Sequence, residues 1–252
     1  ARTMLKALWS GRRTTQNTRL QQAVLINGLE VLWRRSARRT RSLAMKLDKS
    51  GQLIVMTPLG TFERELRRFV QSRWPWVEQQ MRRHAEIAVA VEEASGGVWL
   101  MGEYLSIEVL TGRRKQVVHE ADVLALVSPR KMDSIQQARM ANAWLHSQAE
   151  QQLPLRVAEM SAQTGLQGRA LEVKAYRARW GSCRHDGLIQ LNWKLIMAPP
   201  QVIDYVIVHE LSHLVHFNHS PAFWALVARH CCDFKQRRKW LKENGSVLLA
   251  RA

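Results

Sequence analysis

The stretch Val206–Ser220, VIVHELSHLVHFNHS, decides how the C-terminal half of the chain is interpreted. His209 and His213 stand four residues apart in it, and residues at that spacing lie one turn apart on one face of a helix. Two imidazoles so placed can bind one zinc ion at about 2.0–2.1 Å. Glu210 follows the first histidine, where its carboxylate can accept a proton from water that the ion acidifies. The stretch predicts the active-site helix of a zinc-dependent hydrolase.

A third protein ligand is expected, because a catalytic zinc usually has three and keeps a fourth position for water. If the helix continues, His216 lies about 10.5 Å along its axis from His209, too far to share the ion. His219 follows Asn218, where the chain can turn back. The spacing His209-x3-His213-x5-His219 also matches that of the metzincin motif. We therefore favour His219, with His216 or a distant glutamate as the alternatives.

The flanking residues predict the elements that support this helix. Pro199-Pro200 suits a helix start, so we expect a helix over 201–215 that ends where Asn218 takes the left-handed conformation. Ser220-Pro221, an N-cap residue followed by proline, predicts the start of another helix. Alternation of apolar and polar residues predicts two preceding strands, 171–178 and 188–194, joined by a turn at Asp186-Gly187.

Upstream, the spacing of apolar residues changes several times between that of strands and that of helices. We expect strands within 29–57, 98–110 (a hairpin around Gly102) and 117–127, and helices within 61–91 and 134–157. Pro75 should start a new helix or kink the first one. Ser95-Gly96-Gly97 indicates a linker, and no internal repeat is evident.

Composition limits the class of protein. The 252 residues contain no apolar run of the roughly 18 residues that a membrane span needs, and no leader is evident, so we expect a cytoplasmic protein without a membrane partner. The formal net charge is +17, and residues 1–83 hold 18 Lys+Arg against 5 Asp+Glu. Such a field attracts polyanions, so nucleic acid or a nucleotide could bind the basic N-terminal region. A solvated, arginine-rich surface is the alternative interpretation.

Four motifs carry a resemblance to a known family. They are Arg179-Trp180-Gly181-Ser182-Cys183, Gly187-x-Ile189-x-Leu191-Asn192-Trp193, the segment 202–214, and Asn218-His219-Ser220-x-x-Phe223-Trp224. Together they make the chain resemble the YgjP-like metallopeptidases, zincin-type relatives of the SprT proteases. The match is dense over 171–243 and weaker back to about residue 31. Ser212, and Cys231-Cys232-Asp233 in place of Cys-Pro-Asp, depart from the family pattern without touching the proposed ligands.

The resemblance implies roles for individual residues. His209, His213 and His219 would hold zinc, or another divalent ion, and Glu210 would be catalytic. The 179–183 turn and the 191–193 strand would line the cleft, which makes these residues candidates for substrate binding: Arg179, Trp180, Gly181, Ser182, Asn192 and Trp193. Arg179 could hold a carboxylate or phosphate or stabilise an oxyanion, or it could be a structural arginine packed on Trp180.

We therefore expect an α+β fold in which a β-rich N-terminal part precedes a zincin-like core with an HExxH active-site helix. The expected divisions are 1–28, a basic and poorly ordered terminus; 29–132, a basic β-rich region with one helical segment; and 133–252, the zincin-like catalytic domain.

The predicted function is metal-assisted hydrolysis of a peptide or protein substrate, in which Glu210 accepts a proton from water and delivers it to the leaving amine. Two other functions compete: a metal-dependent nucleoside triphosphate pyrophosphohydrolase, and a non-enzymatic binding module with a structural zinc.

Overall fold

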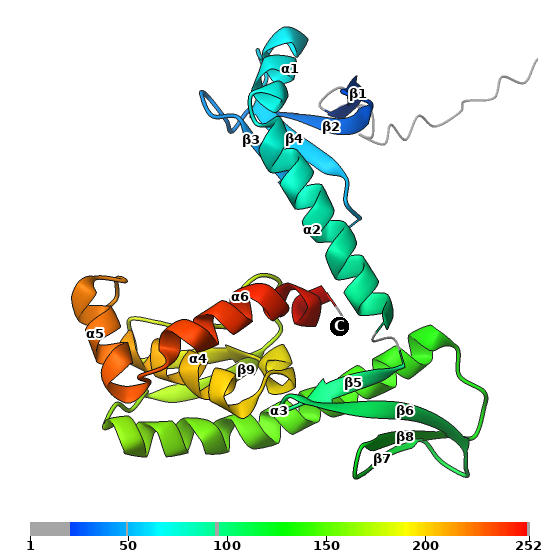
Figure 1. The fold of residues 1–252 in the computed structure, drawn as a ribbon, viewed down its shortest axis with the longest axis vertical. Coiled ribbons are helices and arrows are strands. Elements are labelled where there is room, and N and C mark those ends of the chain that lie inside the picture. Colours follow the sequence, from blue (N-terminus) through cyan, green and yellow to red (C-terminus); the bar gives the residue numbers. More distant parts are fainter. Residues whose placement is uncertain (1–20, 49, 94–95, 251–252) are drawn as a thin grey trace, which may run out of the picture. The chain divides into compact units, whose positions relative to one another are not determined.

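The protein combines β-sheets with α-helices, which confirms the expected α+β class. The computed structural model describes residues 21–48, 50–93 and 96–250. That part of the chain forms three β-sheets and six α-helices (Figure 1). Contacts divide the chain into two compact units, Ala1–Glu86 and Ile87–Ala252, and the second contains the three candidate histidines.

The first unit contains a four-stranded sheet with strand order β1-β2-β4-β3. Its strands are β1 (Gln21–Ile26), β2 (Leu29–Ser36), β3 (Ala44–Leu47) and β4 (Leu53–Pro58). Only β2 and β4 are parallel neighbours in this sheet. The helices α1 (Glu63–Gln71) and α2 (Trp74–Glu93) follow. One face of the sheet and α1 share a core made of Val31, Trp33, Leu53, Val55, Leu66 and Val70.

The second unit begins within the last turns of α2 and contains another four-stranded sheet, of order β5-β6-β8-β7. Its strands are β5 (Gly97–Leu100), β6 (Glu103–Thr111), β7 (Gln116–Glu120) and β8 (Val123–Ser128). The helix α3 (Ser134–Thr164) begins after the N-cap Asp133 and ends at Gly165, whose φ of 70° is readily adopted by glycine. α3 continues past this sheet into the rest of the unit (Figure 1).

These two sheets and the helices after them have the same topology. The strand orders correspond. In each sheet the strand that comes second along the chain runs parallel to the one that comes fourth, β2 to β4 and β6 to β8. Each begins with a hairpin whose two turn residues both have positive φ, Asn27-Gly28 and Met101-Gly102. In each following helix, a side chain in the first turn accepts a hydrogen bond from the N-cap backbone N–H, Glu65 from Phe62 and Gln136 from Asp133. We call them the first repeat (21–71) and the second repeat (97–164).

The repeat corrects the expectation that none exists. The two copies share a burial pattern rather than residue identity, since Val31 and Leu105 are both buried three residues after the turn glycine. A pattern of this kind is visible once strands are paired but leaves little trace in a single sequence.

The remainder of the second unit surrounds the candidate site. A three-stranded sheet of order β10-β11-β9 consists of β9 (Ala170–Lys174), β10 (Gly181–Cys183) and β11 (Leu188–Asn192). A 3-10 helix, η2 (Trp193–Met197), and three α-helices follow: α4 (Pro200–Ser212), α5 (Pro221–His230) and α6 (Phe234–Ala250). Their apolar side chains and the middle of α3 form one core. Arg156 of α3 also makes two hydrogen bonds to the carboxylate of Asp204 on α4, at 2.8 and 2.7 Å.

Several predicted boundaries differ from the structure. Residues 21–26 form β1, paired with β2, so the expectation of a poorly ordered terminus up to residue 28 is wrong for them; residues 1–20 lie outside the described part. The positive-φ turn at Asn27-Gly28 closes that hairpin. The boundary between the units along the chain follows Glu86 rather than residue 132, because β5–β8 belong to the same compact unit as α3.

Three expected elements of the C-terminal part end earlier than predicted, and the first is the strand expected over 171–178, which is β9 and stops at Lys174. β11 stops at Asn192, because the Asn192 side chain accepts a hydrogen bond from the Lys194 backbone N–H and starts η2. α4 ends at Ser212 with ordinary right-handed angles at its C-cap, His213. Asn218 does not have positive φ, so the expected left-handed ending is wrong. The predicted helix starts at Pro75, Pro200 and Pro221 and the hairpin around Gly102 are confirmed.

In the part of the chain that the structure describes, no helix combines the length and the apolar character needed to cross a bilayer.

Candidate metal centre

Helix α4 carries two of the histidines and the glutamate. Pro200 lies in its first turn, where a missing N–H breaks no hydrogen bond of the helix. Most of the helix is buried in the core through Val202, Ile203, Val206, Ile207 and Leu211. This packing fixes the last turn, which contains His209 and Glu210, and the C-cap residue His213.

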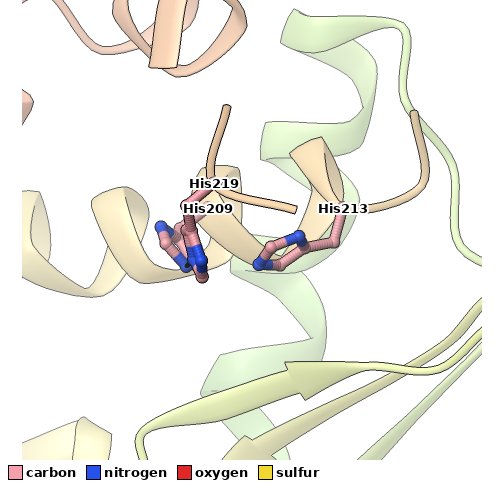
Figure 2. A group of neighbouring side chains, drawn as sticks. All are labelled: His209, His213 and His219. Carbon is pink, nitrogen blue, oxygen red and sulfur yellow. Dashed lines mark hydrogen bonds between the residues drawn. The ribbon is translucent and has the colours of Figure 1, made fainter. Parts of the chain in front are cut away.

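The rings of His209, His213 and His219 converge from α4 and the loop that follows it (Figure 2). One ring nitrogen of each lies within 4.8 Å of those of the other two. Nε2 of His209 and Nε2 of His219 are 3.1 Å apart. The His213 ring centroid lies 5.0 Å from that of His209 and 4.8 Å from that of His219. His216 does not join this group through its ring.

The surroundings keep two of these rings neutral. Burial, reinforced by the neighbouring histidines, lowers the pKa of His209 to about 3. Burial also lowers the pKa of His213. Nδ1 of His213 lies 2.9 Å from the carbonyl oxygen of His216, so this nitrogen carries the hydrogen and Nε2 keeps its lone pair. Neutral imidazoles with free lone pairs are the form that binds a metal ion.

Glu210 is buried beside this group. Its side chain is 6% exposed, and burial raises its pKa to about 8, although the positive charge of Arg179 acts in the opposite direction. Its carboxylate makes no hydrogen bond within the described residues. The carboxylate lies against the backbone of Gly181 on β10, where a Cβ would come within 2.7 Å of its Oε1. Only glycine at position 181 leaves room for the carboxylate in this position.

Aromatic residues of α5 pack against the histidines. Ser220 caps this helix by accepting a hydrogen bond from the Phe223 backbone N–H at 3.4 Å. The Phe223 ring stacks on His213 with centroids 4.5 Å apart, and the Trp224 ring stacks on His219 at 5.6 Å. The sequence placed both residues in a family motif, but their contact with the histidines depends on how α5 folds back towards α4.

The residues predicted to bind substrate lie in different surroundings. Gly181 and Ser182 are on β10, at the edge of the three-stranded sheet, and the Ser182 hydroxyl donates to Oε1 of Gln190. Arg179 is exposed, with its guanidinium 5.4 Å from the ring centre of Tyr176. Trp180 packs against Gly245 of α6. The ring that the Arg179 guanidinium faces is thus that of Tyr176, whereas the structural alternative assumed Trp180.

Asn192 and Trp193 are both buried in the interior. The Asn192 amide donates to the carbonyls of Tyr176 and Arg179, at 3.0 and 2.9 Å, and so holds the 176–180 turn beside the site. Trp193 is 7% exposed and belongs to the core. Their contact with a substrate stays a prediction. Tyr176, which the sequence did not single out, donates to Oε1 of Gln190 at 2.9 Å.

Cys183 lies nearby on β10 but outside the group of ring nitrogens. Burial and the carboxylates of Glu210 and Asp186 raise its pKa to about 11. A thiol with so high a pKa is a poor nucleophile and a poor metal ligand near neutral pH.

The three histidines fit a divalent metal ion such as zinc. Two nitrogens bound to one tetrahedral zinc at about 2.0–2.1 Å are about 3.3 Å apart, close to the 3.1 Å between the Nε2 atoms of His209 and His219. Three imidazoles are a usual zinc ligand set, and they leave a coordination position free. Glu210 follows His209 on α4, and its carboxylate, which lies against Gly181, is not part of this group.

Comparisons with known proteins give one family and one distant structural likeness. The model of the YgjP-like family, described as its metallopeptidase domain, matches residues 41–244. Among solved structures, the crystal structure of the metallopeptidase zymogen of Pyrococcus abyssi abylysin is similar at 17% identity and a TM-score of 0.31. The similarity covers 36% of this chain and 93% of that chain. A search of curated proteins gave no match.

Proposed function

The chain belongs to the YgjP-like metallopeptidase family, and from this premise we propose that it is a zinc-dependent peptidase with α4 as the HExxH helix of a zincin-type core. His209, His213 and His219 would hold zinc or another divalent ion, and Glu210 would be the general base. The observation that carries the proposal is the convergence of three ring nitrogens within 4.8 Å, together with the buried Glu210 that follows His209 on the same helix.

Bound at the three histidines, zinc would acidify a water molecule and polarise the carbonyl of the scissile bond. Glu210 takes the proton from the attacking water and passes it to the nitrogen of the leaving amine. A pKa raised to about 8 suits both steps, because a carboxyl near its pKa can hold a proton and release it. The backbone of Gly181 lies against the Glu210 carboxylate and limits where this group can move.

Arg179 is the residue best placed to bind a charged or polarised part of the substrate. It is exposed, and its charge already influences the pKa of Glu210. A guanidinium there could stabilise the oxyanion or hold a substrate carboxylate.

Three variants test the proposal through metal content and turnover of casein. His213→Ala should lose both metal and activity. Glu210→Gln should keep the metal and lose activity by about 100-fold or more, the usual size of a general-base contribution. His216→Ala is the matched control, since its backbone carbonyl still bonds His213, and it should keep both. Full activity of the Gln variant would refute the proposed mechanism.

A panel of nucleoside triphosphates with added zinc, manganese or magnesium separates the peptidase from the alternatives. Hydrolysis of nucleotides without cleavage of casein would favour the pyrophosphohydrolase. A chain that turns over nothing and unfolds on chelation would be a module with a structural zinc.

A further inference from the structure

Each repeat contains a pocket at the same place, between the segment that enters its third strand and the helix that follows its fourth. The first pocket, about 710 Å³, is lined by Thr40, Arg41, Thr61, Arg68, Phe69 and Ser72, among others. The second, about 650 Å³, is lined by Lys115, Gln116, Gln136, Arg139 and Trp144, among others. We call them the first and second basic pockets.

The cations of the two pockets occupy corresponding positions. Arg41 follows Gly28 by 13 residues, and Lys115 follows Gly102, the glycine of the corresponding turn, by 13 as well (41 − 28 and 115 − 102). Arg68 comes three residues after Glu65, whose side chain caps α1. Arg139 comes three residues after Gln136, which caps α3 in the same way. A pair of cations therefore recurs at corresponding positions, although most residues of the two repeats differ.

These four cations are available to a ligand. Arg41, Arg68, Lys115 and Arg139 are all exposed. Within the described residues, none of their side chains makes a hydrogen bond or an ion pair. Glu65 is the one acidic residue lining the first pocket, and its carboxylate already accepts a hydrogen bond from the Phe62 backbone N–H. No acidic residue lines the second pocket.

Each pocket also offers a partly exposed aromatic ring beside its cations. In the first pocket it is Phe69, over which the guanidinium of Arg73 lies 4.4 Å from the ring centre. In the second it is Trp144, which makes an edge contact with His119. A cationic groove for phosphates next to an aromatic surface for bases is the combination found in proteins that bind single-stranded nucleic acid.

We propose that the two basic pockets bind the backbone of single-stranded nucleic acid, with Arg41 and Arg68 in one and Lys115 and Arg139 in the other contacting phosphates. The pairing of cations with an aromatic ring favours a single strand, whose unstacked bases can reach the ring, over a duplex. This binding is independent of the metal centre, so it neither requires nor tests the proposed peptidase activity.

The test is fluorescence anisotropy of a labelled single-stranded DNA oligonucleotide with the full chain over a series of salt concentrations. Arg41→Gln/Arg68→Gln and Lys115→Gln/Arg139→Gln should each weaken binding about tenfold. Each should also reduce the slope of log K against log salt by about 1.4, the value for two phosphate contacts on a single strand. The thermal unfolding temperature of each variant checks that the exposed substitutions leave the fold intact.

Arg34→Gln/Arg82→Gln is the matched control, because it removes two exposed charges of the first unit that lie outside the pocket. It should weaken binding by no more than about twofold, since charges away from the contact act only through the screened field. The proposal is overturned if this control loses as much affinity as the pocket variants, if duplex DNA binds more tightly than the single strand, or if poly-glutamate displaces the strand as well as unlabelled DNA does. Absence of binding at low salt overturns it too.

Discussion

The first and second repeats have the same strand order but use their last helix differently. In the first repeat, α1 has 9 residues and packs on its own sheet through Leu66 and Val70. In the second, α3 has 31 residues and extends past its sheet, so that Leu145, Ala149 and Leu153 enter the core beneath the metal centre. The longer helix thus connects the sheet of the second repeat to the core that carries the candidate metal centre.

The largest expected effect is the loss of stability when a core leucine is truncated in either repeat. Leu66→Ala and Leu145→Ala each remove a fully buried side chain, so each should lower the free energy of unfolding of its own unit by about 2–5 kcal/mol. Calorimetry with metal titration gives the readout. Leu145→Ala should weaken metal binding, whereas Leu66→Ala should leave it unchanged. An equal loss of metal affinity in both variants would break the comparison.

A smaller effect concerns the ion pairs made by the two helices. Arg156→Ala leaves the Asp204 carboxylate partly buried without its partner and should cost about 2–3 kcal/mol in chemical denaturation. Arg67→Ala is the control, because it removes the more exposed pair with Glu63 on α1, and it should cost about 1 kcal/mol or less. Similar costs would mean that α3 is not anchored to α4 through this pair.

The next prediction compares the turnover of two glycine variants, one in each unit. Gly181→Ala places a Cβ within 2.7 Å of the Glu210 carboxylate, so kcat should fall about 10–100-fold, which corresponds to about 1.4–2.7 kcal/mol. Metal content should not change. Gly60→Ala in the first repeat has open space around the new methyl group and should be neutral in both assays. Normal turnover by Gly181→Ala would show that the position of Glu210 is not critical.

The last expected effect is the dependence of stability on pH. Burial raises the pKa of Glu210 from 4.5 to about 8, so between these values the folded protein keeps a proton that the unfolded chain has released. The free energy of unfolding attributable to this group therefore falls as pH rises through that window. In metal-free protein, Glu210→Gln should therefore gain stability over the wild type across this window, by up to about 1.4 kcal/mol for each pH unit. A constant difference from pH 5 to pH 8 would contradict this assignment.

Features set by local chemistry could be predicted from the sequence. Pro200 and Pro221 start helices because proline fits the first helical turn, and Met101-Gly102 closes a hairpin because glycine accepts positive φ. The spacing of His209 and His213 placed both rings on one side of α4 and in one group with His219.

Features that depend on contacts between distant segments could not be predicted. β1 is strongly polar at its start, and only its pairing with β2 makes it a strand. Trp193 continues the apolar alternation of β11, yet the strand ends at Asn192, whose side-chain amide donates to the carbonyls of Tyr176 and Arg179 in an earlier turn. The contact between Gly181 and Glu210 joins residues 29 positions apart (210 − 181), and a single sequence holds no signal for it.

The length of α3 has a consequence for how the second unit opens. The helix contributes Ala141 to the core of the β5–β8 sheet and Leu145, one turn later, to the core beneath the histidines. Separate opening of either core would leave that half of the helix exposed to water, although Ala141 and Leu145 belong to successive turns of one helix. Amide protons along the middle of α3 should therefore exchange with solvent at one common slow rate, and the two halves of this unit should melt as a single cooperative block.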